Sequence, residues 1–284
     1  NLLRNAEKSN LTSDVSSVKG DQLQKTTSNN PVNALQGRVA GLSVTSPGGN
    51  PGQMSDVRLR GIGTFGGHQP LYVIDGTPGD PYYLNNNDVE SIEVLKDGAA
   101  GSIYGSTSAN GVILITTKRG KKGIPLIDVN SYYGLANPTK KYDFLDAEGY
   151  KTVHKMMYEN AGVTNLPAYI TTNTGVNTNW QDLITRSGNV QNHNINLRGG
   201  GEYLTFALSG DYTNETGTFI GSKFNKKGIR SVNEFKKGIL TVTNNLIFSQ
   251  TRSEGYKFNL ADAYFQSALL PVYDNNEKYG YALT

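Results

Sequence analysis

The sequence contains no cysteine and only three histidines among its 284 residues. Without cysteine there are no disulfide bonds, no thiolate zinc sites and no cysteine nucleophile, and the redox compartment stays open. His68, His154 and His193 lie far apart on different expected elements, which is poor spacing for metal ligands. We therefore predict no metal site and no cofactor.

Long hydrophobic runs and blocks of like charge are also missing. No apolar run approaches the roughly 18 to 20 residues that a membrane helix needs, and no signal-peptide pattern opens the chain. The 27 basic and 24 acidic residues give a net charge of +3 and are scattered, so no basic groove marks a nucleic-acid partner. A helical membrane protein is excluded, whereas a membrane barrel with short alternating strands is allowed.

Glycine and tyrosine are abundant, with 33 and 17 residues, and this mixture is typical of turns and strands. The first half, from Asn10 to about Lys122, predicts a compact α+β unit with a short helix that Asn30 caps and Gly41 ends. Its expected strands are Asp14–Val18, Leu42–Thr45, Val57–Arg60, Leu71–Ile74, Ile92–Leu95 and Val112–Thr117.

After Gly123 the pattern changes to longer segments in which apolar and polar residues alternate. The period-two pattern gives each expected strand one apolar and one polar face. The apolar faces are Ile127, Val129, Tyr133 and Leu135; Leu204, Phe206, Leu208 and Tyr212; and Leu240, Val242, Leu246 and Phe248. Two further candidates are His193–Arg198 and the weaker Phe224–Phe235.

The connections between these strands alternate in length. A long stretch from Pro138 to Gly188, with a helix expected over Ala147–Asn160, is followed by a tight turn at Gly199–Gly201. A medium loop near Glu215–Ser222 and a tight turn at Lys236–Gly238 come next. Outer-membrane barrels have this asymmetry, and because about five strands close no barrel, we expect the polypeptide to continue or other segments to complete it.

Four blocks of the first half carry a family resemblance: NALQGRVAGLSV at Asn33–Val44, VRLRGIGT at Val57–Thr64, PLYVIDG at Pro70–Gly76 and DVESIEVLKDGAAGSIYGSTSANGVILITTKRGKKG at Asp88–Gly123. In order and spacing they resemble the plug domain of TonB-dependent outer-membrane transporters of the SusC/RagA type. The resemblance implies a plug inserted into a 22-stranded barrel and the import of glycans or peptides across the outer membrane, without enzymatic activity.

The resemblance also implies an organisation and a set of partners. Residues 1–9 would be a linker, 10–123 the plug domain, and 124–284 the first strands and extracellular loops of the barrel. The implied partners are a SusD-like surface lipoprotein, the TonB–ExbB–ExbD complex, an oligosaccharide or peptide, and outer-membrane lipid. The opening segment NLLRNAEKSN shows no TonB-contacting box, so we expect no TonB contact from this segment.

Two sets of plug residues are candidates for function. A loop that we expect to contact substrate contains Thr64, Phe65, His68 and Gln69. The cations expected to pair with carboxylates of the barrel wall are Arg58, Arg60, Lys96, Lys118 and Arg119. The tyrosines expected near strand ends, as in an interfacial girdle, are Tyr132, Tyr133, Tyr203 and Tyr212.

Gly61, Gly63 and Gly66 spell a dinucleotide motif, but a strand and no helix follows, so we interpret them as turn residues. Asp75 and Asp80 flank a turn, and we expect them to close it through their own backbone. A receptor that binds or signals without transport is the alternative function, while a soluble carbohydrate-active enzyme finds no supporting carboxylate pair.

Overall fold

The computed structural model describes residues 15–26, 30–45, 50–59, 69–96, 104–105, 108 and 110–273. Its N-terminal part, here called the plug, holds two sheets. The larger has the order β1-β6-β7-β4-β5, with β4 and β7 parallel and the other pairs antiparallel. The strands are β1 (Val15–Lys19), β4 (Leu71–Ile74), β5 (Thr77–Pro78), β6 (Val89–Leu95) and β7 (Val112–Thr117), and β2 (Leu42–Thr45) pairs with β3 (Asp56–Leu59).

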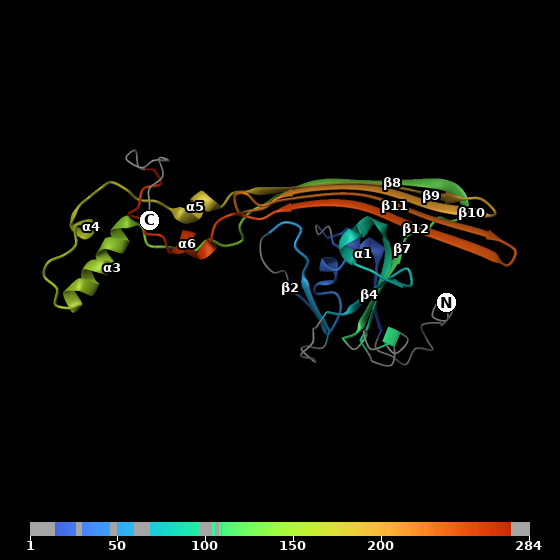
Figure 1. Ribbon diagram of the computed structural model, residues 1–284, viewed down its shortest axis with the longest axis horizontal. Coiled ribbons are helices and arrows are strands. Elements are labelled where there is room, and N and C mark those ends of the chain that lie inside the picture. Colours follow the sequence, from blue (N-terminus) through green and yellow to red (C-terminus); the bar gives the residue numbers. More distant parts are fainter. Residues whose placement is uncertain are drawn as a thin grey trace. The chain divides into compact units, whose positions relative to one another are not determined.

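A second sheet of five long strands follows, here called the wall sheet, in the order β12-β11-β10-β9-β8 (Figure 1). Each strand lies beside its neighbour in sequence, so the sheet is an antiparallel meander. The strands are β8 (Gly123–Ala136), β9 (Gly188–Gly200), β10 (Leu204–Thr216), β11 (Lys223–Lys237) and β12 (Leu240–Glu254). These findings confirm the predicted fold class, a plug followed by antiparallel strands.

Aliphatic side chains from every layer of the plug form its core. Leu23 of the short helix α1 (Gly20–Gln24), Ile92 of β6 and Ile113 of β7 are fully buried. Full burial of such a side chain contributes about 1.5–3 kcal/mol, so a modest number of them stabilises this small unit. The plug therefore has a core of its own.

The prediction of a helix between Asn30 and Gly41 is wrong, because the structure has only the 3₁₀ turn η3 (Asn33–Leu35) there. The Asn30 side chain does accept a hydrogen bond from the Val32 amide at 2.9 Å, as a cap does. The turn stops because Gln36 leaves the helical region and Gly37 adopts a φ of 72°. Burial of the flanking apolar residues replaces regular helical hydrogen bonding.

The chain divides into two compact units, and the plug and the wall sheet both belong to the first. The described residues of the second are 135–188, 217–222 and 254–273. Its helices are α3 (Ala147–Asn160), α4 (Ala168–Thr171), α5 (Trp180–Ile184) and α6 (Leu260–Phe265). The bounds of α3 are those that the sequence predicts, and the Asp146 side chain caps it by accepting from the Gly149 amide at 2.7 Å.

Within the residues described, none of the helices is both long and apolar enough to cross a bilayer.

Candidate functional site

The two faces of the wall sheet differ in chemistry. Asn196, Lys226 and Arg230 point toward the plug and are 3%, 4% and 5% exposed. Ile195 and Ile229, their neighbours along the same strands, are 52% and 58% exposed. The sheet therefore has a polar inner face that contacts the plug and an apolar outer face, as the alternation predicts.

Asp75 is the centre of the contacts between the plug and the inner face. It occupies a two-residue hairpin turn between β4 and β5, with a φ of 51° at Asp75 and 91° at Gly76, which is the geometry of a type I′ turn. Its carboxylate accepts hydrogen bonds from the Thr117 amide at 3.0 Å and the Thr117 hydroxyl at 2.5 Å. Two strands of the plug thus fix the position of this carboxylate.

Two wall strands reach the same carboxylate. Arg230 of β11 donates to Asp75 through Nη2 at 3.2 Å and also donates to the Thr117 hydroxyl. Asn245 of β12 donates at 3.2 Å. The Arg230 and Asp75 side chains are only 6% and 7% exposed, so water screens this ion pair weakly. The prediction that Asp75 closes its own turn is wrong, whereas Asp80 does accept from the Tyr82 amide at 2.9 Å.

A second ion pair joins plug and wall at a wetter position. Arg119, just after β7, donates to Glu234 of β11 at 3.3 Å and lies 3.8 Å from the Asp75 carboxylate. The Arg119 and Glu234 side chains are 27% and 28% exposed. Solvent screening makes such a pair worth about 0–1 kcal/mol, so it contributes less than the pair of Asp75 and Arg230.

Backbone carbonyls of the plug are held by a buried lysine. The Lys226 ammonium of β11 donates to the carbonyl of Tyr82 at 2.8 Å and to that of Leu84 at 3.1 Å. Hydrogen bonds from a charged donor to buried carbonyls each contribute about 1.5–3 kcal/mol. Lys226 therefore fixes the segment that connects β5 to β6.

An amide of β9 holds the next part of the plug. The Asn196 side chain donates to the Asp88 carboxylate at 3.0 Å and to the Asn87 carbonyl at 3.5 Å. Asp88 is 2% exposed and also uses its backbone carbonyl to accept from the Lys118 amide at 2.8 Å. The contacts between plug and wall thus extend over β9, β11 and β12.

Close backbone approach completes the contact. A Cβ atom at Gly120 would lie 2.3 Å from the Phe206 carbonyl and 2.5 Å from the Gly199 carbonyl, so only glycine fits there. A Cβ atom at Gly52 would lie 2.1 Å from the ring of Phe224, which is 4% exposed. The plug is therefore in direct van der Waals contact with the inner face of the wall sheet.

The cations predicted to contact the wall differ in position. Arg58 pairs with Asp56 on its own strand at 2.6 Å, and Lys96 is 9% exposed at the end of β6. Burial, followed by the charge of Arg198, lowers the pKa of Lys118, while Asp128 and other carboxylates oppose that shift. Arg119 pairs with Glu234 as described above, and Arg60 lies outside the described residues. The role of these cations in holding the plug stays a prediction.

Of the residues expected to contact substrate, the structure describes only Gln69; Thr64, Phe65 and His68 lie outside the described residues, as do Gly61, Gly63 and Gly66. The Gln69 amide donates to Asp56 at 3.4 Å. It lines a hollow with Tyr72 and Asp80, where burial first and then the charges of Asp80 and Asp56 raise the pKa of Tyr72. Contact with substrate remains a prediction.

Sequence reasoning missed Asp75, Lys226 and Arg230 as members of one network. Lys226 and Arg230 are four residues apart on β11, so both lie on one face of that strand. The alternation along β11 therefore assigns two cations to its inner face, and this pattern could have indicated a contact with carboxylates or carbonyls of the plug. The position of Asp75 opposite them depends on a contact 155 residues away in the chain, which no local pattern reveals.

Comparison with known proteins gives consistent results. Residues 7–112 match the family profile described as the TonB-dependent Receptor Plug Domain. The chain is 34% identical over 232 residues to the TonB-dependent receptor SusC of Bacteroides thetaiotaomicron, covering 78% of this chain and 22% of the relative. A TonB-dependent receptor of Formosa agariphila is 37% identical, covering 75% of this chain and 21% of the relative. The chain thus spans about a fifth of these relatives' length.

Solved structures show the same fold. A structure of the RagAB peptide importer in the "open-open" state has a TM-score of 0.77 and 25% identity, covering 90% of this chain and 32% of that chain. The ferric citrate transporter FecA, at 14% identity and a TM-score of 0.57, shares the fold alone. The chain belongs to the TonB-dependent receptors of the SusC/RagA type, which are outer-membrane β-barrel proteins, and carries their plug domain and the strands that follow it.

Proposed function

We propose that the receptor containing this chain imports glycans or peptides across the outer membrane, with the plug as the gate. The observation that carries the proposal is the attachment of Asp75 in the plug to Arg230 and Asn245 of the wall. Such a contact holds the plug closed at rest. It consists of separate polar contacts, which a pull on the plug breaks one after another and not all at once.

The partners in this proposal follow from the family. A SusD-type surface lipoprotein presents substrate from outside, and the TonB–ExbB–ExbD complex supplies the pull. The substrate class stays open between oligosaccharide and peptide, because relatives include SusC and the RagAB peptide importer. No step of this mechanism breaks or forms a covalent bond, so the protein acts as a transporter and not as an enzyme.

The test is uptake by cells whose chromosomal copy of the receptor is deleted and replaced by a plasmid-borne copy. Cells with and without TonB are compared. Labelled oligosaccharides and labelled oligopeptides are offered separately, each too large for porins. We expect one class to accumulate inside the cells only when both the receptor and TonB are present. Binding at the surface without TonB-dependent accumulation would contradict import and favour a receptor that signals without transport.

A further inference from the structure

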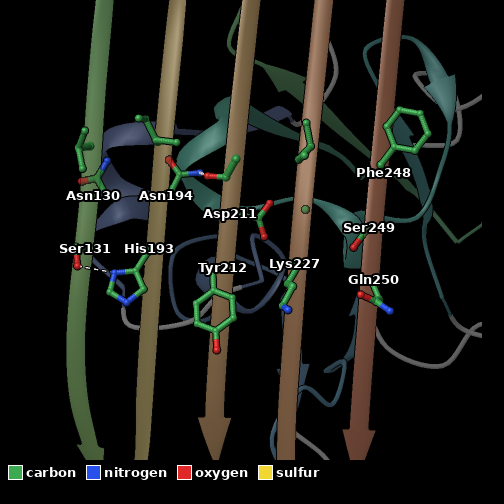
Figure 2. Close-up of a pocket in the computed structure, with 15 residues that line it drawn as sticks. Asn130, Ser131, His193, Asn194, Asp211, Tyr212, Lys227, Phe248, Ser249 and Gln250 are labelled. Carbon is green, nitrogen blue, oxygen red and sulfur yellow. Dashed lines mark hydrogen bonds between the residues drawn. The ribbon is translucent and has the colours of Figure 1, made fainter.

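The outer face of the wall sheet carries a row of polar side chains, one from each strand. Ser131, His193, Tyr212, Lys227 and Gln250 form this row, here called the polar row, as Figure 2 shows. His193, Tyr212 and Lys227 are direct cross-strand partners in the β9–β10 and β10–β11 registers. None of the five faces the plug, so the network at Asp75 does not account for them.

The members of the polar row contact one another. Ser131 Oγ and His193 Nδ1 are hydrogen-bonded at 2.7 Å, and the His193 ring stacks on the Tyr212 ring with 6.1 Å between centroids (Figure 2). The Lys227 ammonium lies 6.0 Å from the centre of the Tyr212 ring. Within the described part of the chain, no carboxylate lies at ion-pair distance from Lys227. The row therefore presents a cation and polar groups to its surroundings.

Apolar residues adjoin the polar row on the side of the tight turns. On β12 this band runs from Leu240 to Phe248, with Asn244 among its members, which is about 27 Å along the strand at ~3.4 Å per residue. On β11 the polar pair Ser231 and Asn233 interrupts it. With a tilt of about 40° it is about 21 Å tall, close to the ~25 Å apolar belt of outer-membrane barrels. On β9 to β12 the polar row therefore lies where the apolar belt ends, on the side of the long connection between β8 and β9, whereas on β8 the apolar side chains Tyr133 and Leu135 continue beyond it.

A hollow opens in the apolar band directly beside the polar row. Gly210 contributes no side chain to the outer face, and Ile195 and Ile229 of the neighbouring strands flank the gap. A Cβ atom at Gly210 would meet only Ile195 Cγ2, at 3.6 Å, so the gap has room for more atoms. An apolar slot beside a cationic row matches an amphiphile with an acyl chain and an anionic headgroup.

Charge on the outer face has one predominant sign. By the alternation of β8 to β12, the carboxylates Asp128, Asp211, Glu215 and Glu234 take inner positions, and Glu254 at the very end of β12 is the exception. The cations Lys223, Lys227, Lys237 and Arg252 take outer positions. Away from Glu254, such a surface attracts an anionic headgroup.

We propose that the polar row and the hollow at Gly210 bind an anionic, phosphate-bearing lipid in the outer leaflet of the membrane. Lys227 contacts the phosphate, with Tyr212 and His193 beside it, and one acyl chain lies against Ile195 and Ile229. This proposal rests on the outer-membrane location of the family and not on import. A receptor that retains lipid and imports nothing would therefore overturn the proposed function alone.

Native mass spectrometry of the whole receptor in detergent, titrated with phosphatidylglycerol or phosphatidylcholine, tests the site. We expect tighter retention of phosphatidylglycerol and about fivefold weaker retention by Lys227→Gln. Lys155→Gln, which removes the same charge from an exposed position on α3, is the matched control and should leave retention unchanged. Equal retention of the two lipids, or equal losses in the two variants, would overturn the proposal.

Gly210→Leu tests the hollow without changing charge. The leucine fills the gap on a face that already carries Ile195 and Ile229, so folding should persist, as heat-modifiable gel mobility would show. We expect at least threefold weaker retention of phosphatidylglycerol, because burial of several methylene groups of the acyl chain is lost. Retention equal to that of the parent would contradict the acyl-chain part of the proposal.

Discussion

The Asp75 carboxylate of the plug and the Arg230 guanidinium of the wall lie 3.2 Å apart, and their side chains are 7% and 6% exposed. They are the most buried of the ion pairs found between the described parts of the plug and the wall sheet. Removing one partner of a buried pair leaves the other charged and unpaired, which costs more than the pair itself contributes.

Arg230→Gln should loosen the plug by about 3 kcal/mol, since Asp75 keeps its charge in a buried position where only the more exposed Arg119, 3.8 Å away, opposes it. The measurement is the rate of limited proteolysis of the plug in the intact receptor. Asp75→Asn combined with Arg230→Gln should be less destabilised than Arg230→Gln alone, because no charge is then left unpaired. Lys223→Gln, an exposed change on the same strand, is the control, and an equal effect there would contradict the assignment.

Arg119→Gln should have a much smaller effect. Its pair with Glu234 is more than a quarter exposed on both sides, so the loss should be at most about 1 kcal/mol. The same proteolysis assay applies, and its dependence on salt is informative, because screening weakens exposed pairs first. A loss as large as that of Arg230→Gln would show that burial does not rank these two pairs.

Gly120→Ala should disturb the seating of the plug, because its Cβ atom would lie 2.3 Å and 2.5 Å from two wall carbonyls. Backbone atoms cannot rotate away as the end of a side chain can, so the segment after β7 must shift. Gly134→Ala on β8 is the matched control, with no atom within 4 Å of the added methyl group. We expect a lower yield of the heat-modifiable, folded receptor for Gly120→Ala only. Equal yields would contradict the close approach.

The lowered pKa of Lys118 should make the stability of the plug depend on pH. Burial and Arg198 lower the pKa of its ammonium in the folded protein, so the unfolded chain holds the proton more tightly. The resulting destabilisation is full below the folded pKa, declines as the pH rises through it, and vanishes above about 10.5. Lys118→Met should therefore stabilise the plug at neutral pH and lose that advantage on the way to about pH 10.5. Urea unfolding of the plug followed against pH checks the sign, and an advantage that grows with pH would contradict it.

The wall sheet was largely predictable from sequence because lipid imposes a strict rule on one face. Leu246 and Phe248 are 45% and 68% exposed at positions that the alternation assigns to the apolar face. The helix Ala147–Asn160 was likewise predictable, since an N-cap aspartate acts locally. The tight turn expected at Gly199–Gly201 exists but begins later, because Gly199 and Gly200 still pair with β10 and only Gly201 lies in the connection. Elements whose formation depends only on residues close in sequence could therefore be predicted.

The plug-to-wall site was less predictable for the opposite reason. The local sequence around Asp75 indicates only a turn residue, and no neighbouring residue indicates a contact with Arg230 or Asn245. The expected helix after Asn30 does not form because Gln36 and then Gly37 leave the helical region within one turn. The predicted boundaries at residues 9 and 123 stay predictions, as do the tyrosine girdle and the substrate loop.

In the proposed mechanism, the plug must separate from the wall for import. Asp88 and Asn196 are short, hydrogen-bonded across that contact at 3.0 Å, and lie in a chain without cysteine, so Asp88→Cys with Asn196→Cys places two thiols on opposite sides of the contact, and gel mobility before and after reduction shows whether they are joined. The measurement is TonB-dependent uptake by this double variant before and after reduction, with each single variant as control. We expect uptake to be blocked while the disulfide is intact and to return on reduction. Undiminished uptake with the disulfide fully formed would contradict this mechanism.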